Sequence, residues 1–459
     1  MPTTTKLGPS NADIASLSQR MRGRLVRPTD TAYEGARRVW NGMIDRYPAL
    51  IAQVVDQDDV AVAIQFGRRH GMPIAVRGGG HGVAGNAVCD NGLVIDLAGM
   101  TEIKVDPVGR TASAEGGVRW SGLDAATQAH GLATTGGLIS TTGIAGLTLG
   151  GGIGWLMRKF GLTSDNVVRL HMVTADGRSV VAESDREPDL FWALRGGAGR
   201  FGAVTRIEYR LHPVDTVFAG MVMYRAELAA DVLALWKRLC DDAPDELTTV
   251  VSFLRAPPAP FVPESLHGQP VVAIVGCHVG DAAAGADALS ELRRFGPPEV
   301  DLFGPMPYLA LQSMLDEGAP FGIRAYWKSG YLRELGPKEI ETIVNHSAAA
   351  PSPFTQVHLH QMGGAVSRNL AGSTAFGHRD AAYLLNIAGG WAEASDDPAN
   401  IAWTRAFWSA IRPATDGAYV NFLGGDDGPL LREAYEPEAL ARLEAIRAVW
   451  DPDGVFSTL

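Results

Sequence analysis

The chain has 459 residues, of which 46% are hydrophobic and 20% charged, an ordinary composition for a folded protein that is too long for one core, so two domains are expected. Its 40 basic and 51 acidic residues give a formal net charge of −11, which argues against nucleic acid or an anionic membrane as the main partner. The N-terminus lacks the apolar core of a signal peptide, and no run approaches the roughly 18 apolar residues of a membrane span, so we expect a cytoplasmic protein.

Up to Pro213, short strands alternate with helices. Apolar runs and alternation predict strands at Leu50–Val55, Pro73–Val76, Leu93–Leu97, Thr111–Glu115, Val167–Thr174 and Val204–His212. The spacing of apolar residues predicts helices at Asp58–His70 and Trp120–Ala129, each of which ends at a glycine.

Three consecutive glycines and a histidine follow the second of these strands, within the sequence PIAVRGGGHGVAG of Pro73–Gly85. Because glycine has no Cβ, the backbone N–H groups of such a loop can close on an anionic ligand. His81 lies inside the loop, and imidazole is a nucleophile that is mostly neutral near neutral pH. The pattern indicates a phosphate-bearing cofactor with a covalent link to the histidine. A glycine-rich turn between two strands, with a bystander histidine, is the plainer interpretation.

The same loop also matches the dinucleotide fingerprint G-x-G-x-x-G, at Gly80–Gly85. That fingerprint requires a helix that opens at the loop. Here Asn86, Asn91 and Gly92 interrupt the chain, and the strand at Leu93–Leu97 follows at once. The sequence leaves no room for a crossover helix, which argues against a Rossmann fold.

A second glycine-rich segment spans Thr134–Asn166, with four glycines in Gly150–Gly154 and a helix-like run at Trp155–Phe160. Its glycines alternate with isoleucine, leucine and valine, unlike the polar residues of a flexible linker. Two such segments in one chain predict one extended ligand that backbone groups hold along its length.

From about Val214 the pattern changes to strands of a largely antiparallel sheet, with helices between them. Strands are predicted at Ala219–Tyr224, Thr248–Leu254, Val271–Val279, Thr355–Gln361 and Ala382–Ile387. Helices are predicted at Ala226–Asp241, Ala282–Phe295 and Leu430–Trp450.

The two glycine-rich segments resemble those of the vanillyl-alcohol oxidase/p-cresol methylhydroxylase superfamily, and within it the berberine bridge enzyme-like FAD-linked oxidases, with the architecture of the 6-hydroxy-D-nicotine oxidases. Later stretches are similar to further motifs of that family, in the same order: Asp189–Val204, Tyr326–Ser329, Phe376–Arg379, Tyr419–Phe422 and Asp451–Asp453. Arg200 and Gly377 depart from the family pattern, which has asparagine and proline there. The resemblance covers nearly the whole chain.

The resemblance implies an α+β fold. Residues 1–213 and 414–459 would form an FAD-binding domain, and residues 214–413 a substrate-binding domain whose largely antiparallel sheet, flanked by helices, covers the flavin. FAD is the implied cofactor, with the His81 ring bonded to the 8α-methyl group. The residues that the resemblance assigns to FAD binding are Arg77, Gly78, Gly79, Gly80, His81, Gly82, Thr141, Thr142, Gly143, Gly146, Gly150, Gly151, Gly154, Val204 and Asn421.

Two positions of the second segment bear on the chemistry. Doubly linked relatives have a cysteine where this chain has Ile139, and none of its cysteines (Cys89, Cys240 and Cys277) lies in that loop or shows metal spacing. A single link is therefore predicted. Thr142 stands at the family's oxygen-gating position, where a short side chain leaves room for O₂, although it could merely cap a turn.

This chain lacks the family's usual base, the group that takes the substrate's proton. Asn386 aligns with a catalytic glutamate of the family, and because an amide cannot take a proton, Asn386 would orient the substrate. Tyr419 is then the predicted base, with its pKa lowered from about 10 by a cation such as Lys328. Tyr419 and Asn421 are expected on one face of a strand, toward the flavin. The plainer interpretations are that Tyr419 packs in the core, that the amide of Asn386 is hydrogen-bonded within the protein, and that Lys328 is solvated.

The implied activity is that of an FAD-dependent oxidase, a monomer or homodimer, that takes a hydride from a small alcohol or amine and reduces O₂ to H₂O₂. Two alternatives stay open. One is a flavin dehydrogenase with another electron acceptor. The other, since the family's glutamate is absent, is a flavin-binding protein without efficient turnover. A reductase of the UDP-sugar type would need a nicotinamide site that the sequence does not show, and the fold does not fix the substrate.

Overall fold

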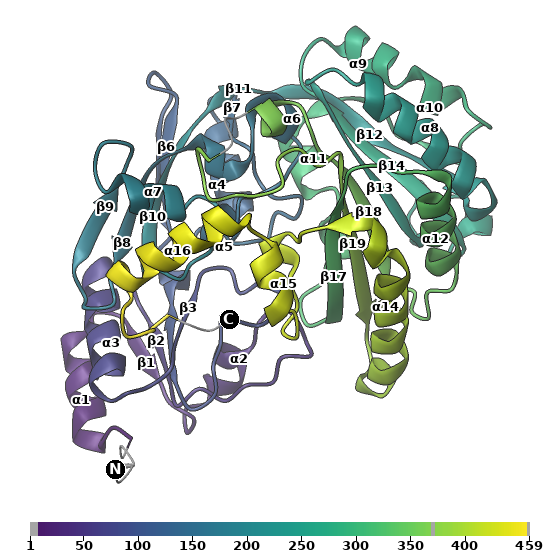
Figure 1. Cartoon of the computed structure of the whole chain (residues 1–459). Coiled ribbons are helices and arrows are strands. Elements are labelled where there is room, and N and C mark those ends of the chain that lie inside the picture. Colours follow the sequence, from purple (N-terminus) through teal and green to yellow (C-terminus); the bar gives the residue numbers. More distant parts are fainter. Residues whose placement is uncertain (1–7, 369–371, 457–459) are drawn as a thin grey trace.

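The strands of the protein form two moderate-sized sheets in its N-terminal part and one large sheet in its middle part (Figure 1). The computed structural model describes residues 8–368 and 372–456. The predicted lack of a signal peptide concerns an N-terminus whose first seven residues lie outside these ranges. Within the ranges, no helix is both long enough and apolar enough to cross a membrane.

The first sheet has the order β1 (Arg24–Val26), β2 (Leu50–Gln53), β4 (Leu93–Asp96) and β3 (Ile74–Arg77). Helix α3 (Gln57–Arg69) packs Val60, Ala63 and Ile64 into the core beside it. Strands β3 and β4 are parallel neighbours, so the chain between them has to cross from one end of the sheet to the other. Residues 78–92 make this crossing without a helix, as the sequence predicted.

The second sheet is antiparallel, in the order β5 (Ile103–Asp106), β6 (Thr111–Glu115), β10 (Ala203–Arg210), β8 (Val167–Val173) and β9 (Ser179–Ala182). Helix α7 (Pro188–Ala193) shares its core with α15 (Gly428–Glu433) and α16 (Pro437–Trp450), through Leu190, Leu431 and Leu443. The yellow helices of Figure 1 show this return of the C-terminal segment to the N-terminal part.

The large sheet has nine strands, and every pair in it is antiparallel. Its order is β15 (Val300–Asp301), β12 (Thr216–Arg225), β14 (Pro270–His278), β13 (Leu247–Arg255), β18 (Gln356–Gln361), β19 (Tyr383–Trp391), β17 (Arg324–Leu332) and β20 (Thr415–Asp416), with β16 (Gly304–Pro307) also paired to β12. Strands β12, β13 and β14 are buried along nearly their whole length, which explains their continuous apolar sequences.

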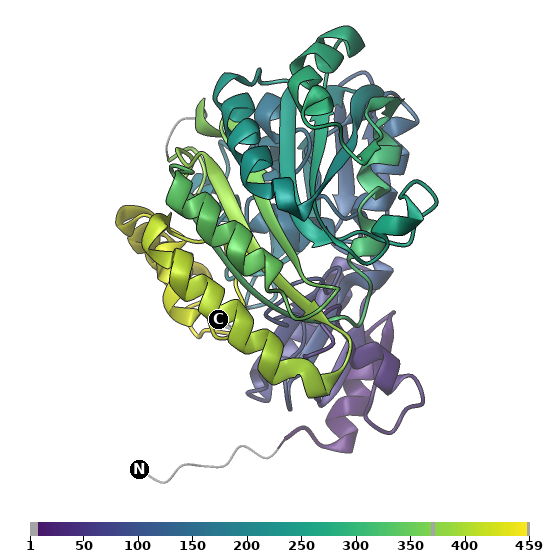
Figure 2. The same cartoon turned by 90° about the vertical axis from the view of Figure 1, so that its right-hand side faces the viewer.

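One face of this sheet is covered by α8 (Ala229–Asp242), α12 (Pro337–Ala348) and α14 (Asp397–Ile411), which share a core with it (Figure 2). The other face is turned toward the N-terminal part. The expected α+β fold, with a largely antiparallel sheet flanked by helices, is thereby confirmed.

The remaining elements complete the chain. The helices are α1 (Asn11–Arg20), α2 (Tyr33–Arg37), α4 (Trp120–Gln128), α5 (Ile144–Leu149), α6 (Met157–Phe160), α9 (Ala282–Ala288), α10 (Ser290–Arg294), α11 (Tyr308–Ser313) and α13 (Ala365–Arg368). A small sheet pairs β7 (Leu132–Ala133) with β11 (His212–Pro213).

Three predicted elements differ from the structure. The helix predicted over Ala282–Phe295 is two helices, α9 and α10, that meet at Leu289. The helix predicted over Leu430–Trp450 breaks before Pro437, because the residue that precedes a proline disfavours helical backbone and Glu436 is extended. The strand predicted around Tyr419 is a 3₁₀ turn, η8 (Val420–Phe422), with Tyr419 as its N-cap.

Candidate functional site

The loop after β3 presents a row of unused hydrogen-bond donors. Within the described part of the chain, none of the backbone N–H groups of Gly78–Gly82 donates to a protein acceptor. Gly80 has a φ of +68°, which glycine adopts without strain. A Cβ on Gly82 would meet no atom within 4 Å. The loop can therefore serve as a cradle for an anionic group, and its role in cofactor binding stays a prediction.

His81 is held in this cradle by two contacts. Its Nε2 atom lies 3.0 Å from Oγ1 of Thr141, and its ring stacks on Trp40 with centroids 5.1 Å apart and planes 19° apart. Burial, with a smaller contribution from the charge of Arg119, lowers the pKa of His81 to about 4. The imidazole is therefore neutral at physiological pH, and its position is fixed.

The second glycine-rich segment crosses the first at this point. A Cβ on Gly79 would overlap the backbone of Gly143, and a Cβ on Gly143 would overlap Gly79. This close approach places Thr141 and Thr142 against the His81 loop. Three residues after Gly143, on α5, Gly146 is exposed, and a Cβ there would meet no atom within 4 Å. The sequence analysis expected the two segments to act on one ligand, and the structure brings them together here.

The glycines at 150–154 have a different role. Gly151 and Gly152 donate their N–H groups inside the protein, to the carbonyl of Thr148 and to the phenol oxygen of Tyr419. A Cβ on Gly150 would overlap the side chain of Asn421, and a Cβ on Gly154 would overlap the carbonyl of Gly136. Close packing against protein thus accounts for these glycines, which the sequence analysis placed against a ligand.

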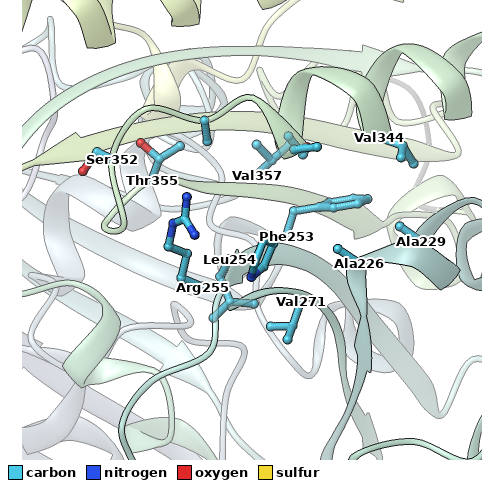
Figure 3. Close-up of a pocket in the computed structure, with 14 residues that line it drawn as sticks. Ala226, Ala229, Phe253, Leu254, Arg255, Val271, Val344, Ser352, Thr355 and Val357 are labelled. Carbon is cyan, nitrogen blue, oxygen red and sulfur yellow. The ribbon is translucent and has the colours of Figure 1, made fainter. Parts of the chain in front are cut away.

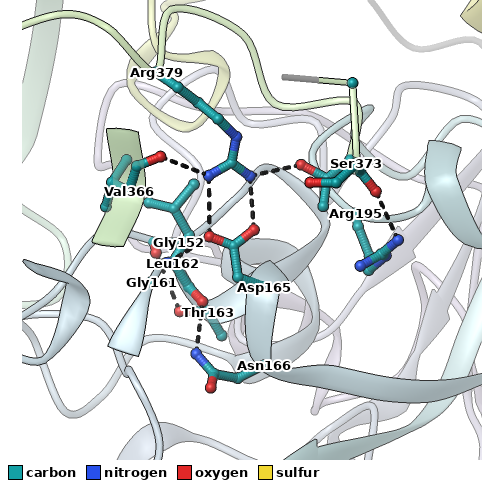
Figure 4. Close-up of polar contacts among 12 residues, drawn as sticks. Gly152, Gly161, Leu162, Thr163, Asp165, Asn166, Arg195, Val366, Ser373 and Arg379 are labelled. Carbon is teal, nitrogen blue, oxygen red and sulfur yellow. Dashed lines mark hydrogen bonds and ion pairs between the residues drawn. The ribbon is translucent and has the colours of Figure 1, made fainter. Parts of the chain in front are cut away.

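A buried ion pair anchors the end of this second segment (Figure 4). Asp165 accepts hydrogen bonds from both terminal nitrogens of Arg379, at 2.6 and 3.0 Å, and both side chains are more than nine-tenths buried. Arg379 also donates to Thr374 and to the carbonyl of Val366. The Phe376–Arg379 motif therefore holds the end of the second glycine-rich segment in place through Asp165.

Two of the predicted cofactor residues support the cradle from behind. The guanidinium of Arg77 is buried against Asp96 at 2.7 Å and donates to the carbonyl of Arg38. It is therefore already paired inside the protein. Val204 is buried at the start of β10. Its carbonyl oxygen lies where a Cβ on Gly116 would be, and the carbonyl of Gly116 in turn limits the space around Gly78.

Tyr419 and Asn421 do meet, although on a 3₁₀ turn and not on a strand. Nδ2 of Asn421 donates to the phenol oxygen of Tyr419 at 2.9 Å and to the carbonyl of Leu147 at 3.0 Å. The N–H of Gly152 donates to the same phenol oxygen at 3.0 Å. Burial raises the pKa of Tyr419 to about 12, and the donated hydrogen bonds offset this only in part. Its role as a base stays a prediction.

Lys328 does not accompany Tyr419. It pairs in register with Ile387, whose side chain belongs to the helix-covered core, so Lys328 lies on the face of the sheet turned away from the cradle. Its ammonium is buried and bound by the carboxylates of Asp426 and Asp427. Burial alone would lower the pKa of Lys328, but these two hydrogen bonds outweigh it and the pKa is raised. The predicted activation of Tyr419 by Lys328 is therefore wrong.

The opposite face of the same strands carries side chains that the sequence analysis missed. Trp327, Ser329, His358 and His360 alternate with the helix-facing residues, and Asn386 lies between Ser329 and His358 in register. The repeat in QVHLHQ of β18, with two histidines two residues apart, was the available signal. Asn386, predicted to orient substrate, is 2% exposed on this face.

A chain of aromatic contacts connects this face to the cradle. Trp327 lies edge-on to Trp40 and to Phe422, each with centroids 5.6 Å apart. Phe422 in turn contacts His360, at 5.8 Å, and Tyr419, at 4.9 Å. Since Trp40 stacks on His81, one wall of rings runs from the cradle to the sheet.

A hollow elsewhere on the large sheet is unrelated to this site (Figure 3). Phe253 and Val357, which line it, belong to the helix-covered core. Small apolar residues, serine and threonine residues and Arg255 complete its wall. The described residues contain no group of three or more histidine, cysteine, aspartate or glutamate side chains that could hold a metal ion.

Comparison with known proteins agrees with the geometry. Residues 48–183, which include the cradle and the crossing, match the family model described as an FAD binding domain. The chain is 29% identical over 453 residues to (R)-6-hydroxynicotine oxidase of Paenarthrobacter nicotinovorans, covering 95% of each protein. It is also 29% identical over 417 residues to an FAD-linked oxidoreductase of Dictyostelium discoideum, covering 90% of this chain and 89% of that protein.

Solved structures show the same fold over nearly the whole chain. The crystal structure of 6-hydroxy-D-nicotine oxidase from Arthrobacter nicotinovorans superposes with a TM-score of 0.85 at 26% identity, covering 95% of this chain and 96% of that one. Berberine bridge enzyme superposes with a TM-score of 0.85 at 21% identity, covering 98% of each chain. At that lower identity the likeness concerns the fold alone.

Proposed function

The chain belongs to the FAD-linked oxidoreductases of the vanillyl-alcohol oxidase/p-cresol methylhydroxylase superfamily, and from this premise we propose that it is an oxidase of small molecules with FAD bound covalently through His81. Its substrate is a small alcohol or amine, and its electron acceptor is O₂. The observation that carries the proposal is the neutral, immobilised imidazole of His81 at the end of a row of free N–H groups.

The residues of the cradle fit FAD. Its pyrophosphate is an anion, and the free N–H groups of Gly78–Gly82 are donors that need an acceptor. When bound, FAD supplies the two-electron acceptor of the reaction. An alcohol that becomes a carbonyl compound loses a hydride from carbon and a proton from oxygen. O₂ takes up the electron pair with two protons and leaves as H₂O₂.

The side chain of His81 suits covalent attachment. A neutral imidazole is nucleophilic, and a pKa of about 4 keeps this one neutral across the physiological range. Thr141 and Trp40 fix the orientation of the ring. A second bond is not expected, because Ile139 has no nucleophile, and burial raises the pKa of each of the cysteine thiols, that of Cys89 to about 11.

Tyr419 is the candidate base. The N–H of Gly152 and Nδ2 of Asn421 both donate to its oxygen, and hydrogen bonds of this kind stabilise a phenolate. Asn386 has no basic group and would orient the substrate.

The covalent link is tested by acid precipitation. We expect the purified protein to be yellow and its flavin to stay with the precipitated polypeptide, and we expect His81→Ala to release the flavin into the supernatant. The control is His346→Ala, since His346 is also a histidine with a pKa lowered by burial but lies on α12, outside the site. Acid-stable flavin in His81→Ala, or a flavopeptide linked through cysteine, would contradict the assignment.

Oxygen as the acceptor is tested at Thr142. Leucine at this position would crowd the space beside Gly79, so Thr142→Leu should slow the reaction of the reduced enzyme with O₂ more than its reduction by substrate. Stopped-flow measurement of the two half-reactions separates these effects. If the wild-type protein consumes substrate with a dye but releases no peroxide in air, the protein is a dehydrogenase.

A further inference from the structure

The face of the large sheet that is turned toward the cradle buries polar atoms without partners. Oγ of Ser329, Oδ1 of Asn386 and Nε2 of His360 form no hydrogen bond with any residue in the described ranges. The three residues are only 1%, 2% and 2% exposed. A buried polar group left unpaired costs about 1–3 kcal/mol. Three of them on one face indicate a bound molecule that supplies the missing hydrogen bonds.

The three residues share one stretch of this face. Ser329 lies directly opposite Asn386, and Asn386 directly opposite His358, on three neighbouring strands. His360 follows His358 on the same face of β18 and lies opposite Leu384, diagonal to Asn386. In an antiparallel pair, Cβ atoms are about 5 Å apart at opposite positions and about 7–8 Å apart on the diagonal, which long side chains still span. A small molecule between Asn386 and His360 can therefore contact both.

This face carries no formal charge. On β13, β18, β19 and β17 the residues that point toward the cradle are Thr248, Val250, Ser252, Leu254, Gln356, His358, His360, Leu384, Asn386, Ala388, Gly390, Ala325, Trp327, Ser329 and Tyr331. The strand residues Arg324 and Lys328 lie on the opposite face, paired with Asp397 and with Asp426 and Asp427. Burial lowers the pKa of His358 to about 4 and that of His360 to about 3, so both are neutral.

The carboxylate beside this face is already occupied. Gln356 donates to the carbonyl of Gly318, which brings the neighbouring Asp316 close to the face. Both oxygens of Asp316, however, accept hydrogen bonds from Ser140, one from its N–H and one from its hydroxyl. An ammonium or a carboxylate buried among these strand residues would have no counter-ion on the four strands themselves, which is strongly unfavourable.

Resting on the proposed function, we propose that the substrate is an uncharged, hydroxyl-bearing molecule, an alcohol and not a protonated amine or a carboxylate. Before the reaction its hydroxyl group donates to Oδ1 of Asn386 and accepts from the N–H at Nε2 of His360, and it turns toward Tyr419 to give up its proton. Its apolar part packs on Trp327 and Phe422. The proposed function allows an alcohol or an amine as substrate, and this proposal selects the alcohol. The rings of Trp327, Trp40 and His81 form the continuous wall along which such a molecule lies near the cofactor.

The test is a binding experiment on the flavin-loaded protein without oxygen. Benzyl alcohol, benzylamine and benzoate share one ring and carry zero, positive and negative charge at neutral pH. Each is titrated, and its Kd is read from the perturbation of the flavin absorption spectrum. We expect benzyl alcohol to bind at least tenfold more tightly than either ion. Equal or tighter binding of an ion overturns the proposal, as does failure of benzyl alcohol to perturb the spectrum up to its solubility limit.

Asn386→Asp gives the sharper result, because it places a carboxylate on the neutral face. The preference should reverse, with benzylamine binding at least tenfold more tightly than benzyl alcohol. The matched control is Asn345→Asp, the same change on an exposed position of α12, which should leave all three Kd values unaltered. An unchanged preference in Asn386→Asp overturns the proposal.

Asn386→Leu covers the case in which the aspartate variant does not fold. It removes the unpaired polar atom at nearly constant volume, so the melting temperature should rise while benzyl alcohol binds at least tenfold more weakly. A fall in the melting temperature would show that Asn386 has a structural role and would overturn the proposal.

These outcomes are separable from failure of the proposed function. A yellow protein that binds the alcohol but releases no peroxide is not an oxidase, yet keeps this substrate class. A protein that oxidises amines and releases peroxide is an oxidase with a different substrate class.

Discussion

The glycines at 78–82 and those at 150–154 look alike in the sequence, but their N–H groups have different surroundings, although Gly79 packs against Gly143 as closely as the second set packs against protein. The N–H groups of the first set have no acceptor within the described ranges, and space is open beside Gly82. In the second set, Gly151 and Gly152 donate internally, and Gly150 and Gly154 face protein atoms at close range. The first set is suited to a ligand and the second to dense packing.

The difference teaches that a glycine-rich segment has two physical causes. A missing Cβ admits either a ligand or another part of the same chain to the backbone. The two cases differ in whether each backbone N–H group has an acceptor within the protein, since buried donors in native structures are nearly all paired. A row of unpaired donors is therefore the better sign of a binding site.

The largest expected effect is at Gly154. A Cβ there would overlap the carbonyl of Gly136, and backbone cannot move aside cheaply, so Gly154→Ala should destabilise the protein by at least about 3 kcal/mol. Gly82→Ala should leave the unfolding midpoint nearly unchanged, because the added methyl group meets nothing. Urea denaturation measures both. Equal stability of the two variants would remove the distinction between the segments.

A similar loss of stability is expected when the ion pair between Arg379 and Asp165 is broken. Arg379→Met leaves the carboxylate of Asp165 without its bidentate partner, and breaking a buried ion pair costs about 3–5 kcal/mol. At a temperature where the variant is still folded, acid-stable flavin should be retained, since the free N–H row is untouched. Complete loss of flavin from the folded variant would instead make this ion pair part of the cofactor site.

Gly152, in the second set of glycines, donates to the phenol oxygen of Tyr419. A variant of Tyr419 therefore tests whether that set also supports catalysis. Tyr419→Phe should slow reduction of the flavin by roughly 10²–10⁴-fold, the usual contribution of a positioned base. A base must be deprotonated to act, and the pKa of Tyr419 is about 12. The wild-type reduction rate should therefore rise with pH up to pH 10, and the variant's should not. A wild-type profile that is flat over this range would exclude Tyr419 as the base.

The smallest of these effects concerns Asp124, a buried carboxyl on α4 that accepts a hydrogen bond from Gln312 at 2.8 Å. Burial raises its pKa to about 7, which the hydrogen bond from Gln312 offsets in part. Between its unfolded pKa near 4 and this value the folded state binds the extra proton, so stability falls as pH rises.

Asp124→Asn removes this dependence. The variant should be more stable than the wild type at neutral pH, by roughly 2–4 kcal/mol, and nearly equal to it at pH 4. Urea denaturation at the two pH values checks this. Parallel stability profiles of the two proteins would show that Asp124 titrates normally.

The sequence by itself determined the general plan and the first segment. The apolar periodicity of the strands, the absence of a helix between β3 and β4, and His81 within three glycines all follow from local composition, which acts over a few residues. The order of motifs along the chain carried the resemblance and, with it, the α+β fold.

Only the tertiary structure decided which side chains share the site. Tyr326, Trp327, Lys328 and Ser329 are all amphipathic or small, so the sequence does not say which alternate residues of β17 face the cradle, and a shift by one residue exchanges the faces. Lys328 was consequently expected near Tyr419, and Trp327 and Ser329, although part of the Tyr326–Ser329 motif, were not assigned to the site. Whether an N–H group or a carboxamide finds a partner depends on segments hundreds of residues away, as between Gly152 and Tyr419, and long-range packing alone settles it.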